Sequence, residues 1–243
     1  MAKEQLPCTY DIAVKIVGEF EGTGYGSVSG NFDGMGISAG ILQWNLGSGT
    51  LQDNILSYCD VTQHNFPVCI KPLQTLKKSD AVAWAKDVMH DSRGKLKQEW
   101  AIAWKMFMTS PVVVNLQKRA IDKYWHRARE ICGQLGFPQE YPRAMVFAFD
   151  IAVQNWSYDI GRPALNYEQA GNIIQLYGSK NFALWNAETV NQDQQIMLIA
   201  AHLRALKCKP EWRHAVFVRK ATIAIGIGYV NGVTMDFRKL FKR

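Results

Sequence analysis

A glycine-rich segment near the N-terminus places the strongest constraint on what this chain can fold into. Nine of the 19 glycines fall within residues 22–50, GTGYGSVSGNFDGMGISAGILQWNLGSGT, where the apolar residues show no helical period. Glycine, Asn and Asp between short β-prone pieces are typical of the turns in an irregular hairpin. The segment therefore predicts a small β element, with GYGSVS and GISAGIL as its candidate strands.

The rest of the chain has the apolar spacing of consecutive helices. Helices are predicted over residues 10–20, 79–91, with Ser79 as N-cap, and 95–108. Further helices should begin at prolines, which are tolerated at the first helical position, or after a capping box. These starts are Pro111 (ending at Gly133 or Gly136), Pro142, Thr189 with Gln192, and Pro210 (ending at Gly226 or Gly228). The predicted fold class is mostly α with one small β element.

Length and composition predict one globular domain over residues 1–243. The chain is 48% hydrophobic and 20% charged, and no apolar run approaches the ~20 residues that span a bilayer. The start, MAKEQLPCTYD, lacks the basic and apolar regions of a secretory signal. We therefore expect synthesis in the cytoplasm without that signal, or a C-terminal module of a longer protein.

The charge of the chain favours an anionic partner. Its formal net charge is +7 and its pI is near 9.1, so nucleic acid, acidic lipid and peptidoglycan all qualify. Basic residues are densest at Arg238, Lys239, Lys242 and Arg243. A solvated basic surface explains this pattern as well as a functional patch does.

The cysteines and histidines show no pattern of a metal site. No two of the five cysteines (Cys8, Cys59, Cys69, Cys132, Cys208) form a CxxC pair, and the histidines form no HExxH motif. Cys59 and Cys69 could form a disulfide in an oxidising compartment, or remain buried thiols. We expect neither a metal nor a cofactor.

Two carboxylates flank the start of the glycine-rich segment. Glu21 lies four residues after Val17 and so continues the apolar face of the first helix at its end. Partial burial there would favour the protonated form that a general acid needs at neutral pH. Asp33 lies in NFDGMG, where flanking glycines leave it open to solvent and ionised. Two carboxylates in contrasting environments are the minimum equipment for glycoside hydrolysis.

The stretch EFEG…NFDGMGISAGILQWN resembles the active-site segment of glycoside hydrolase family 46, the chitosanases, and of lysozyme-like phage endolysins and type VI secretion effectors. The shared pattern is a helix-terminal Glu, a variable hairpin, then Asp-Gly-x-Gly-x-[Thr/Ser]-Ala-Gly-Ile. The resemblance implies an α+β lysozyme-like fold, with two helical lobes and the 22–50 hairpin lining the cleft. It also implies Glu21 as acid, Asp33 as base and Ser38 as the hydroxyl that helps hold the attacking water.

Two later segments resemble the same family more loosely. FAFDIAVQNW resembles its central helix, in which an Asp, here Asp150, joins a buried charge network. Arg213 and Arg219 resemble the arginines that link such an Asp towards the acid. An equally good interpretation is that Asp150 is a core carboxylate paired with N–H groups or an arginine, without a direct part in catalysis. The ending RKATIAIGIGYVNG is closer to the endolysins and effectors.

These residues predict a peptidoglycan hydrolase of the muramidase type, because a chain with excess basic residues attracts an anionic wall polymer and repels polycationic chitosan. The resemblance further implies inversion at the anomeric carbon. Five residues of the segment are candidate sugar ligands, although aromatic residues in such hairpins more often pack inward: Tyr25, Phe32, Gln43, Trp44 and Asn45.

Other functions remain open at this point. A chitosanase or a lytic transglycosylase would use the same Glu21, and a wall-binding or nucleic-acid-binding module would need neither carboxylate. The favoured reading has peptidoglycan strands as partner, with no nucleic acid, no membrane insertion and a monomeric chain. Action on the periplasmic wall fits a phage endolysin released by lysis, or an injected effector with a cognate immunity protein.

Overall fold

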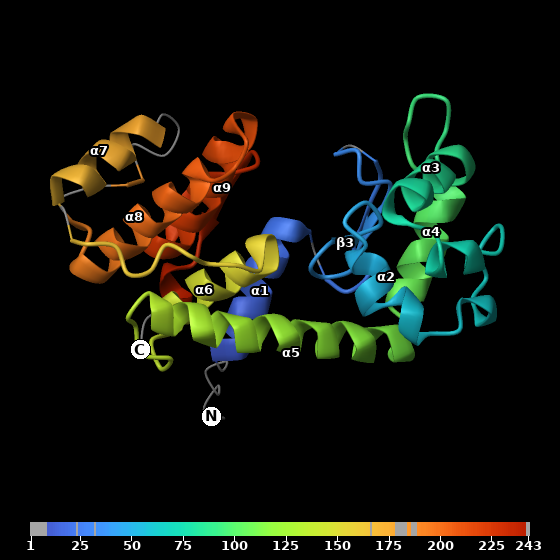
Figure 1. Cartoon of the computed structure of the whole chain (residues 1–243), viewed down its shortest axis with the longest axis horizontal. Helices are drawn as coiled ribbons and strands as arrows, with labels where there is room; N and C mark the ends of the chain where they lie inside the picture. Colours follow the sequence, from blue (N-terminus) through green and yellow to red (C-terminus); the bar gives the residue numbers. More distant parts are fainter. Residues whose placement is uncertain are drawn as a thin grey trace, which may run out of the picture. The chain divides into compact units, whose positions relative to one another are not determined.

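The computed structural model describes residues 9–22, 24–31, 33–165, 167–177, 184–185 and 189–241. They divide into two compact units. The hairpin unit is Glu21–Lys123; the helical unit combines the chain up to Phe20 with residues from Tyr124 onward. Helix α1 (Thr9–Glu21) and the long helix α5 (Pro111–Gln134) each contribute to both units (Figure 1).

The hairpin unit opens with a three-stranded antiparallel sheet of order β1-β2-β3. Its strands are β1 (Val28–Ser29), β2 (Ser38–Ala39) and β3 (Trp44–Asn45). Glycines at positive φ, among them Gly34, Gly36 and Gly40, keep the strands short. The β element predicted within residues 22–50 is therefore confirmed. The elements that follow are α2 (Thr50–Asn54), η1 (Leu56–Tyr58), η2 (Val61–Gln63), η3 (Lys71–Gln74), α3 (Lys78–Met89) and α4 (Gln98–Met108).

Two predicted helix starts in this unit are wrong. Lys77 is the N-cap of α3, without a side-chain cap, so the predicted cap Ser79 lies inside the first turn. Residues 95–97 are not helical, because His90 and Leu96 pair as an antiparallel bridge around a tight turn. The Asp91 carboxylate accepts hydrogen bonds from the backbone of Arg93 and Lys95 and so stabilises this turn over a helix.

A buried glutamine ties the hairpin unit together. Gln117 of α5 has no exposed surface. Its Oε1 accepts from the backbone N–H of Ile41 at 3.1 Å, and its Nε2 donates to the carbonyls of Met108 at 2.7 Å and Tyr25 at 3.3 Å. One carboxamide thus holds the sheet, the loop before it and the end of α4 to α5.

The helical unit is a layer of packed helices with a C-terminal hairpin. Helices α8 and α9 lie side by side, and α6 packs against α9 (Figure 1). Helix α6 is buried along almost its whole length, as predicted for the segment that Pro142 opens. The elements are α6 (Pro142–Asn155), α7 (Tyr167–Tyr177), α8 (Gln192–Leu206), α9 (Pro210–Ile225), β4 (Ile227–Val230), β5 (Val233–Asp236) and η5 (Arg238–Phe241).

The start of α8 and the segment after α9 differ from the predictions. The capping box of α8 is formed by Asn191 and Gln194, two positions after the predicted pair of Thr189 and Gln192. Helix α9 ends at Gly226, at φ 98, as predicted, but the chain then forms the unpredicted β4–β5 hairpin. Asn231 and Gly232, at φ 50 and 88, have the left-handed backbone that a two-residue hairpin turn requires.

Cysteine pairing and membrane-spanning segments can be stated for the described part of the chain. There, Cys59, Cys69, Cys132 and Cys208 are all free thiols, so the alternative of a Cys59–Cys69 disulfide is not realised; Cys8 lies outside the described residues. None of the described helices combines the length and apolar character needed to cross a bilayer.

Candidate active site

Glu21 is the last residue of α1 and is half-buried. The chain leaves the helix through Gly22 at φ +120, a conformation that L side chains rarely adopt. A Cβ at Gly22 would also clash with the hydroxyl oxygen of Ser27. Glycine at this position therefore allows the sharp exit that leaves Glu21 at the helix end.

The residue before Glu21 is anchored in the helical unit. Phe20 is 8% exposed, and its ring lies edge-on to Phe237 at 5.7 Å between centroids. The guanidinium carbon of Arg219 lies 4.8 Å from the Phe20 ring centroid, within cation–π range. The backbone that carries Glu21 thus has a fixed base on α9 and on the segment after β5.

Asp33 lies in the turn between β1 and β2 and is exposed. Its Oδ1 accepts a hydrogen bond from the backbone N–H of Met35 at 3.0 Å. Two residues earlier, Asn31 Oδ1 accepts from the N–H of Gly36 at 2.7 Å. The two bonds order the loop while leaving the Asp33 carboxylate in contact with solvent.

Ser38 lies in the middle strand and is 4% exposed. In the sheet register it pairs with Ser29 on one side and with Asn45 on the other, so these three polar side chains share one face. Ser29 Oγ donates to Gln43 Oε1 at 2.8 Å, and Asn45 Oδ1 accepts from the N–H of Ser48 at 2.8 Å. Of the predicted ligands, Gln43 therefore uses its side-chain oxygen to bind β1, and Asn45 uses its own to stabilise the turn after β3.

The two aromatic candidates within the described residues, Tyr25 and Trp44, do not form an exposed platform. Trp44 is 2% exposed, and a Cβ at Gly40 would lie 3.0 Å from its ring. The structure corrects the prediction of Trp44 as a sugar ligand, because the buried ring has no face open to a ligand. Tyr25 is half-buried, with its carbonyl bound to Gln117. Phe32 lies outside the described residues.

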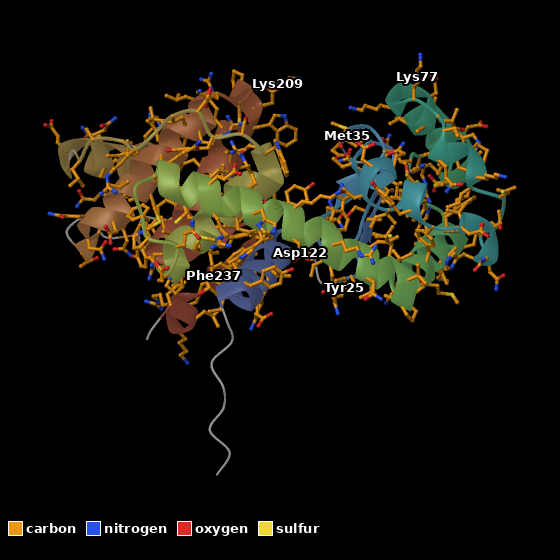
Figure 2. All side chains as sticks on the ribbon, turned by 60° about the horizontal axis from the view of Figure 1, so that its bottom comes forward. Tyr25, Met35, Lys77, Asp122, Lys209 and Phe237 are labelled. Carbon is orange, nitrogen blue, oxygen red and sulfur yellow. The ribbon has the colours of Figure 1, made fainter. Side chains whose placement is uncertain are left out.

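A pocket of about 920 Å³ opens beside Asp33, in the hairpin unit. Gly34 and Met35, which follow Asp33, line one part of it, and Lys77 lines another; Figure 2 labels Met35 and Lys77. The remaining lining residues come from the segment after β3 and from the start of α3: Gly47, Gly49, Gln52, Asp53, Ser57, Gln74, Leu76, Lys78, Ser79 and Val82. The sequence analysis did not predict these residues, although the basic pair Lys77 and Lys78 at the start of α3 could have indicated them.

The predicted charge network is present in the helical unit with one member exchanged. Asp150 is fully buried; its Oδ1 lies 2.6 Å from Arg219 Nε and its Oδ2 lies 2.7 Å from Lys220 Nζ. Lys220 Nζ also donates to Gln154 Oε1 at 2.6 Å. Arg213 instead donates to the carbonyl of Cys208 at 3.2 Å. It lies six residues from Arg219, roughly 240° around the helix, and so faces elsewhere.

The charges of this network shift the pKa values of Asp150 and Lys220. Burial pushes the pKa of Asp150 upward, but the positive charges of Arg219 and Lys220 and their hydrogen bonds outweigh burial and hold that pKa below its ordinary value. Burial, which Asp150 offsets only in part, lowers the pKa of the Lys220 ammonium. The three groups therefore form a buried cluster in which the single carboxylate of Asp150 faces two cationic side chains.

The arrangement suits acid–base chemistry. Within the described residues, no three side chains of His, Cys, Asp or Glu gather closely enough to hold a metal ion. The hairpin unit carries a half-buried Glu21 and an exposed Asp33, with a pocket beside the latter. A shielded carboxyl can donate a proton and an exposed carboxylate can accept one.

Comparison with known proteins identifies a fold relative. No family model and no curated protein sequence matches the chain. Its structure is similar to that of a GH46 chitosanase from Gynuella sunshinyii, GsCsn46A, in complex with chitotetraose. The TM-score is 0.56 at 16% identity, over 95% of this chain and 98% of the chitosanase. The chain therefore has the mostly helical, lysozyme-like fold of that enzyme, and the predicted fold class is confirmed.

Proposed function

We propose that this chain is a glycoside hydrolase that cleaves the backbone of an amino-sugar polysaccharide, with Glu21 as general acid and Asp33 as general base. The observation that carries the proposal is the contrast between the half-buried Glu21 at a helix end and the exposed Asp33 in an ordered turn beside a large pocket. The chitosanase-like fold supports the same reaction class.

The reaction follows from the two roles. Glu21 protonates the glycosidic oxygen as the bond to the anomeric carbon breaks and positive charge develops on the sugar ring. Asp33 removes a proton from a water molecule, which attacks the anomeric carbon from the opposite face. In this mechanism the sugar leaves with inverted anomeric configuration, and both carboxyl groups return to their starting states after a proton exchange with solvent.

Three other residues support the pair in this proposal. Ser38, in the strand that follows the Asp33 turn, is the candidate to orient the water. Arg219 acts as a positioning residue, because it holds the Phe20 ring directly before Glu21. Asp150 fixes Arg219 in turn through its 2.6 Å hydrogen bond.

Two polymers are candidates, each favoured by its own observation. The fold likeness to a chitosanase bound to chitotetraose favours chitosan over the peptidoglycan predicted from net charge. The formal charge of +7 and the lysines that line the pocket favour an anionic glycan, peptidoglycan among them. Charge over the whole chain does not describe a binding site, so a direct assay must decide.

The test is product analysis with both polymers. The purified chain would be incubated with chitosan and with insoluble peptidoglycan, and soluble products identified by mass spectrometry. Glu21→Gln and Asp33→Asn should each lower the rate by about 10²–10⁴-fold, while circular dichroism shows that they fold. Glu19→Gln, an exposed carboxylate two residues earlier on α1, is the matched control and should keep full activity.

The product termini identify the reaction. Reducing sugar ends, absent with Glu21→Gln, support hydrolysis. The sugar at that end identifies which glycosidic bond is cleaved. Anhydro-muramic ends formed by an active Asp33→Asn variant would replace the proposal with a lytic transglycosylase. An unmodified wild-type chain that releases nothing from either polymer would overturn it.

A further inference from the structure

We infer that the pocket beside Asp33 is an anion-selecting subsite, which binds a carboxylate substituent carried by the glycan. This inference rests on the proposed function and adds a substrate class to it. The pocket, about 920 Å³, has room for a sugar ring with its substituents. Its three walls are the Asp33 turn, the segment around α2 and the start of α3.

Two glycines bring these walls together. A Cβ at Gly47 would overlap Met35 Sδ, so only glycine lets the Asp33 turn pack this closely on the segment after β3. A Cβ at Gly49 would lie 2.8 Å from Lys78 Cε, and the Lys78 stem therefore lies across this backbone. Contact along its stem restricts where the Lys78 ammonium can reach, although the residue is exposed.

Two lysines at the start of α3 line the pocket; the first turn of this helix also holds Asp80, which is not among the lining residues. Lys77, Lys78 and Ser79 all line the pocket, and the Lys77 side chain does not cap the helix. The first N–H groups of a helix without a side-chain cap attract anions, and the helix dipole adds to the effect. Neither lysine forms an ion pair within the described part of the chain, while the lining holds a single carboxylate, Asp53.

A buried amide in the lining independently indicates a ligand. Gln52 is 7% exposed and lines the pocket. Its Oε1 is buried and has no hydrogen-bond partner among the residues that the structure describes. A buried polar atom without a partner destabilises the fold, so its retention here is explained if the amide bonds to a ligand. A carboxamide suits the hydroxyl or acetamido groups that neighbour a carboxylate on an amino sugar.

Equilibrium binding to matched oligosaccharides tests the inference, with the Glu21→Gln chain used to prevent cleavage. The first probe is a neutral tetrasaccharide of N-acetylglucosamine. The second alternates N-acetylglucosamine with N-acetylmuramic acid and so adds lactyl carboxylates. The third is the methyl ester of the second, which keeps its size and removes the charge. Calorimetry should give a Kd about tenfold lower for the acid than for its ester, the gain typical of one charge-assisted hydrogen bond.

Variants assign that preference to the pocket. Lys77→Gln with Lys78→Gln should abolish the tenfold difference between acid and ester, while Lys86→Gln, an exposed lysine further along α3, should preserve it. Gln52→Met should weaken binding of all three probes without lowering the melting temperature, because it removes the unpartnered polar atom. A Gln52→Met chain that unfolds more easily but binds normally would show that this amide stabilises the fold and does not bind the ligand.

Failure of the inference is distinguishable from failure of the proposed function. Equal affinities for acid and ester, or an acid preference that survives loss of both lysines, would overturn the subsite even if the wild-type chain hydrolyses a glycan. Conversely, a chain that binds the acid through Lys77 and Lys78 and cleaves no glycan would keep the subsite and overturn the hydrolase.

Discussion

Gln117 Oε1 accepts a hydrogen bond from the backbone N–H of Ile41 at 3.1 Å, across the core of the hairpin unit. Gln117→Leu removes this bond and the two that its Nε2 donates, leaving buried backbone groups without partners. We expect it to lower the free energy of unfolding by about 3 kcal/mol, measured by urea denaturation. Gln134→Leu, at the exposed end of the same helix, should change it by less than about 0.5 kcal/mol. Equal losses in the two variants would contradict the role of Gln117.

Alanine variants at Gly22 and Gly24 distinguish the cost of backbone strain from the cost of steric overlap. Both have positive φ, but a Cβ at Gly24 meets nothing within 4 Å, whereas one at Gly22 clashes with Ser27. Gly24→Ala should cost about 1 kcal/mol of stability. Gly22→Ala should cost more and also lower glycan hydrolysis, because the exit of the chain after Glu21 must shift. Paired denaturation and activity assays check this; full activity in Gly22→Ala would show that the exit geometry is unimportant.

The buried Asp150 should contribute to stability at neutral pH and lose that contribution in acid. Because the folded state holds its pKa below the ordinary 3.8, the unfolded chain binds this proton more tightly. The contribution is therefore present above about pH 4 and is lost as pH falls through the folded-state pKa. Asp150→Asn leaves Arg219 and Lys220 as uncompensated buried cations and should cost about 3–5 kcal/mol at pH 7.

Urea denaturation between pH 2.5 and pH 7 measures that dependence, with the range chosen to bracket the carboxylate titration. The difference in stability between wild type and Asp150→Asn should shrink towards the acid end. Glu211→Gln, an exposed carboxylate on α9, is the control and should follow the wild-type curve. A difference that stays constant with pH would show that Asp150 acts by packing alone.

The thiols should differ sharply in reactivity. Burial, followed by the charge of Glu140, raises the pKa of Cys132 to about 11, while Cys69 is exposed. Since the thiolate is the reactive form, iodoacetamide at about pH 8 should alkylate Cys69 in the folded chain and leave Cys132 unmodified. Peptide mass spectrometry over a time course reads out each site. Alkylation of Cys132 as fast as Cys69 under native conditions would mean that this part of the core opens readily.

Much of the fold could be predicted because its signals are local. Pro111, Pro142 and Pro210 each stand at the first position of the helix predicted from them, since a missing N–H costs nothing there. The glycine-rich segment forms a sheet, and Gly226 ends α9. In each case one residue type limits the backbone, whatever surrounds it.

The predictions of local structure were wrong where several residues compete for the same role, or where a residue's partner is distant in the sequence. Thr189 and Asn191 both precede α8, and the hydrogen bonds to Gln194 decide for Asn191. The Asn-Gly turn of β4–β5 was a readable hairpin signal that the preceding helix pattern obscured.

The candidate site shows the same limit. Arg219 was identified with Asp150, but Lys220 was missed, because an isolated lysine in a helix usually faces solvent. The pocket could not be predicted as a whole, since its lining combines residues 34–35, 47–57 and 74–82 through backbone contacts at Gly47 and Gly49. Local spacing carries no information on such contacts.

The packing of Phe20 against Arg219 and Phe237 also bears on when, during biosynthesis, the proposed hydrolase activity can arise. The ribosome makes these partners about 200 residues after α1, a delay of about 10–40 s at 5–20 residues per second. Until then the helix end that carries Glu21 lacks its anchor, whatever the glycine-rich segment has already formed. A nascent or prematurely terminated chain that stops before α9 is therefore expected to be harmless to any glycan in its surroundings.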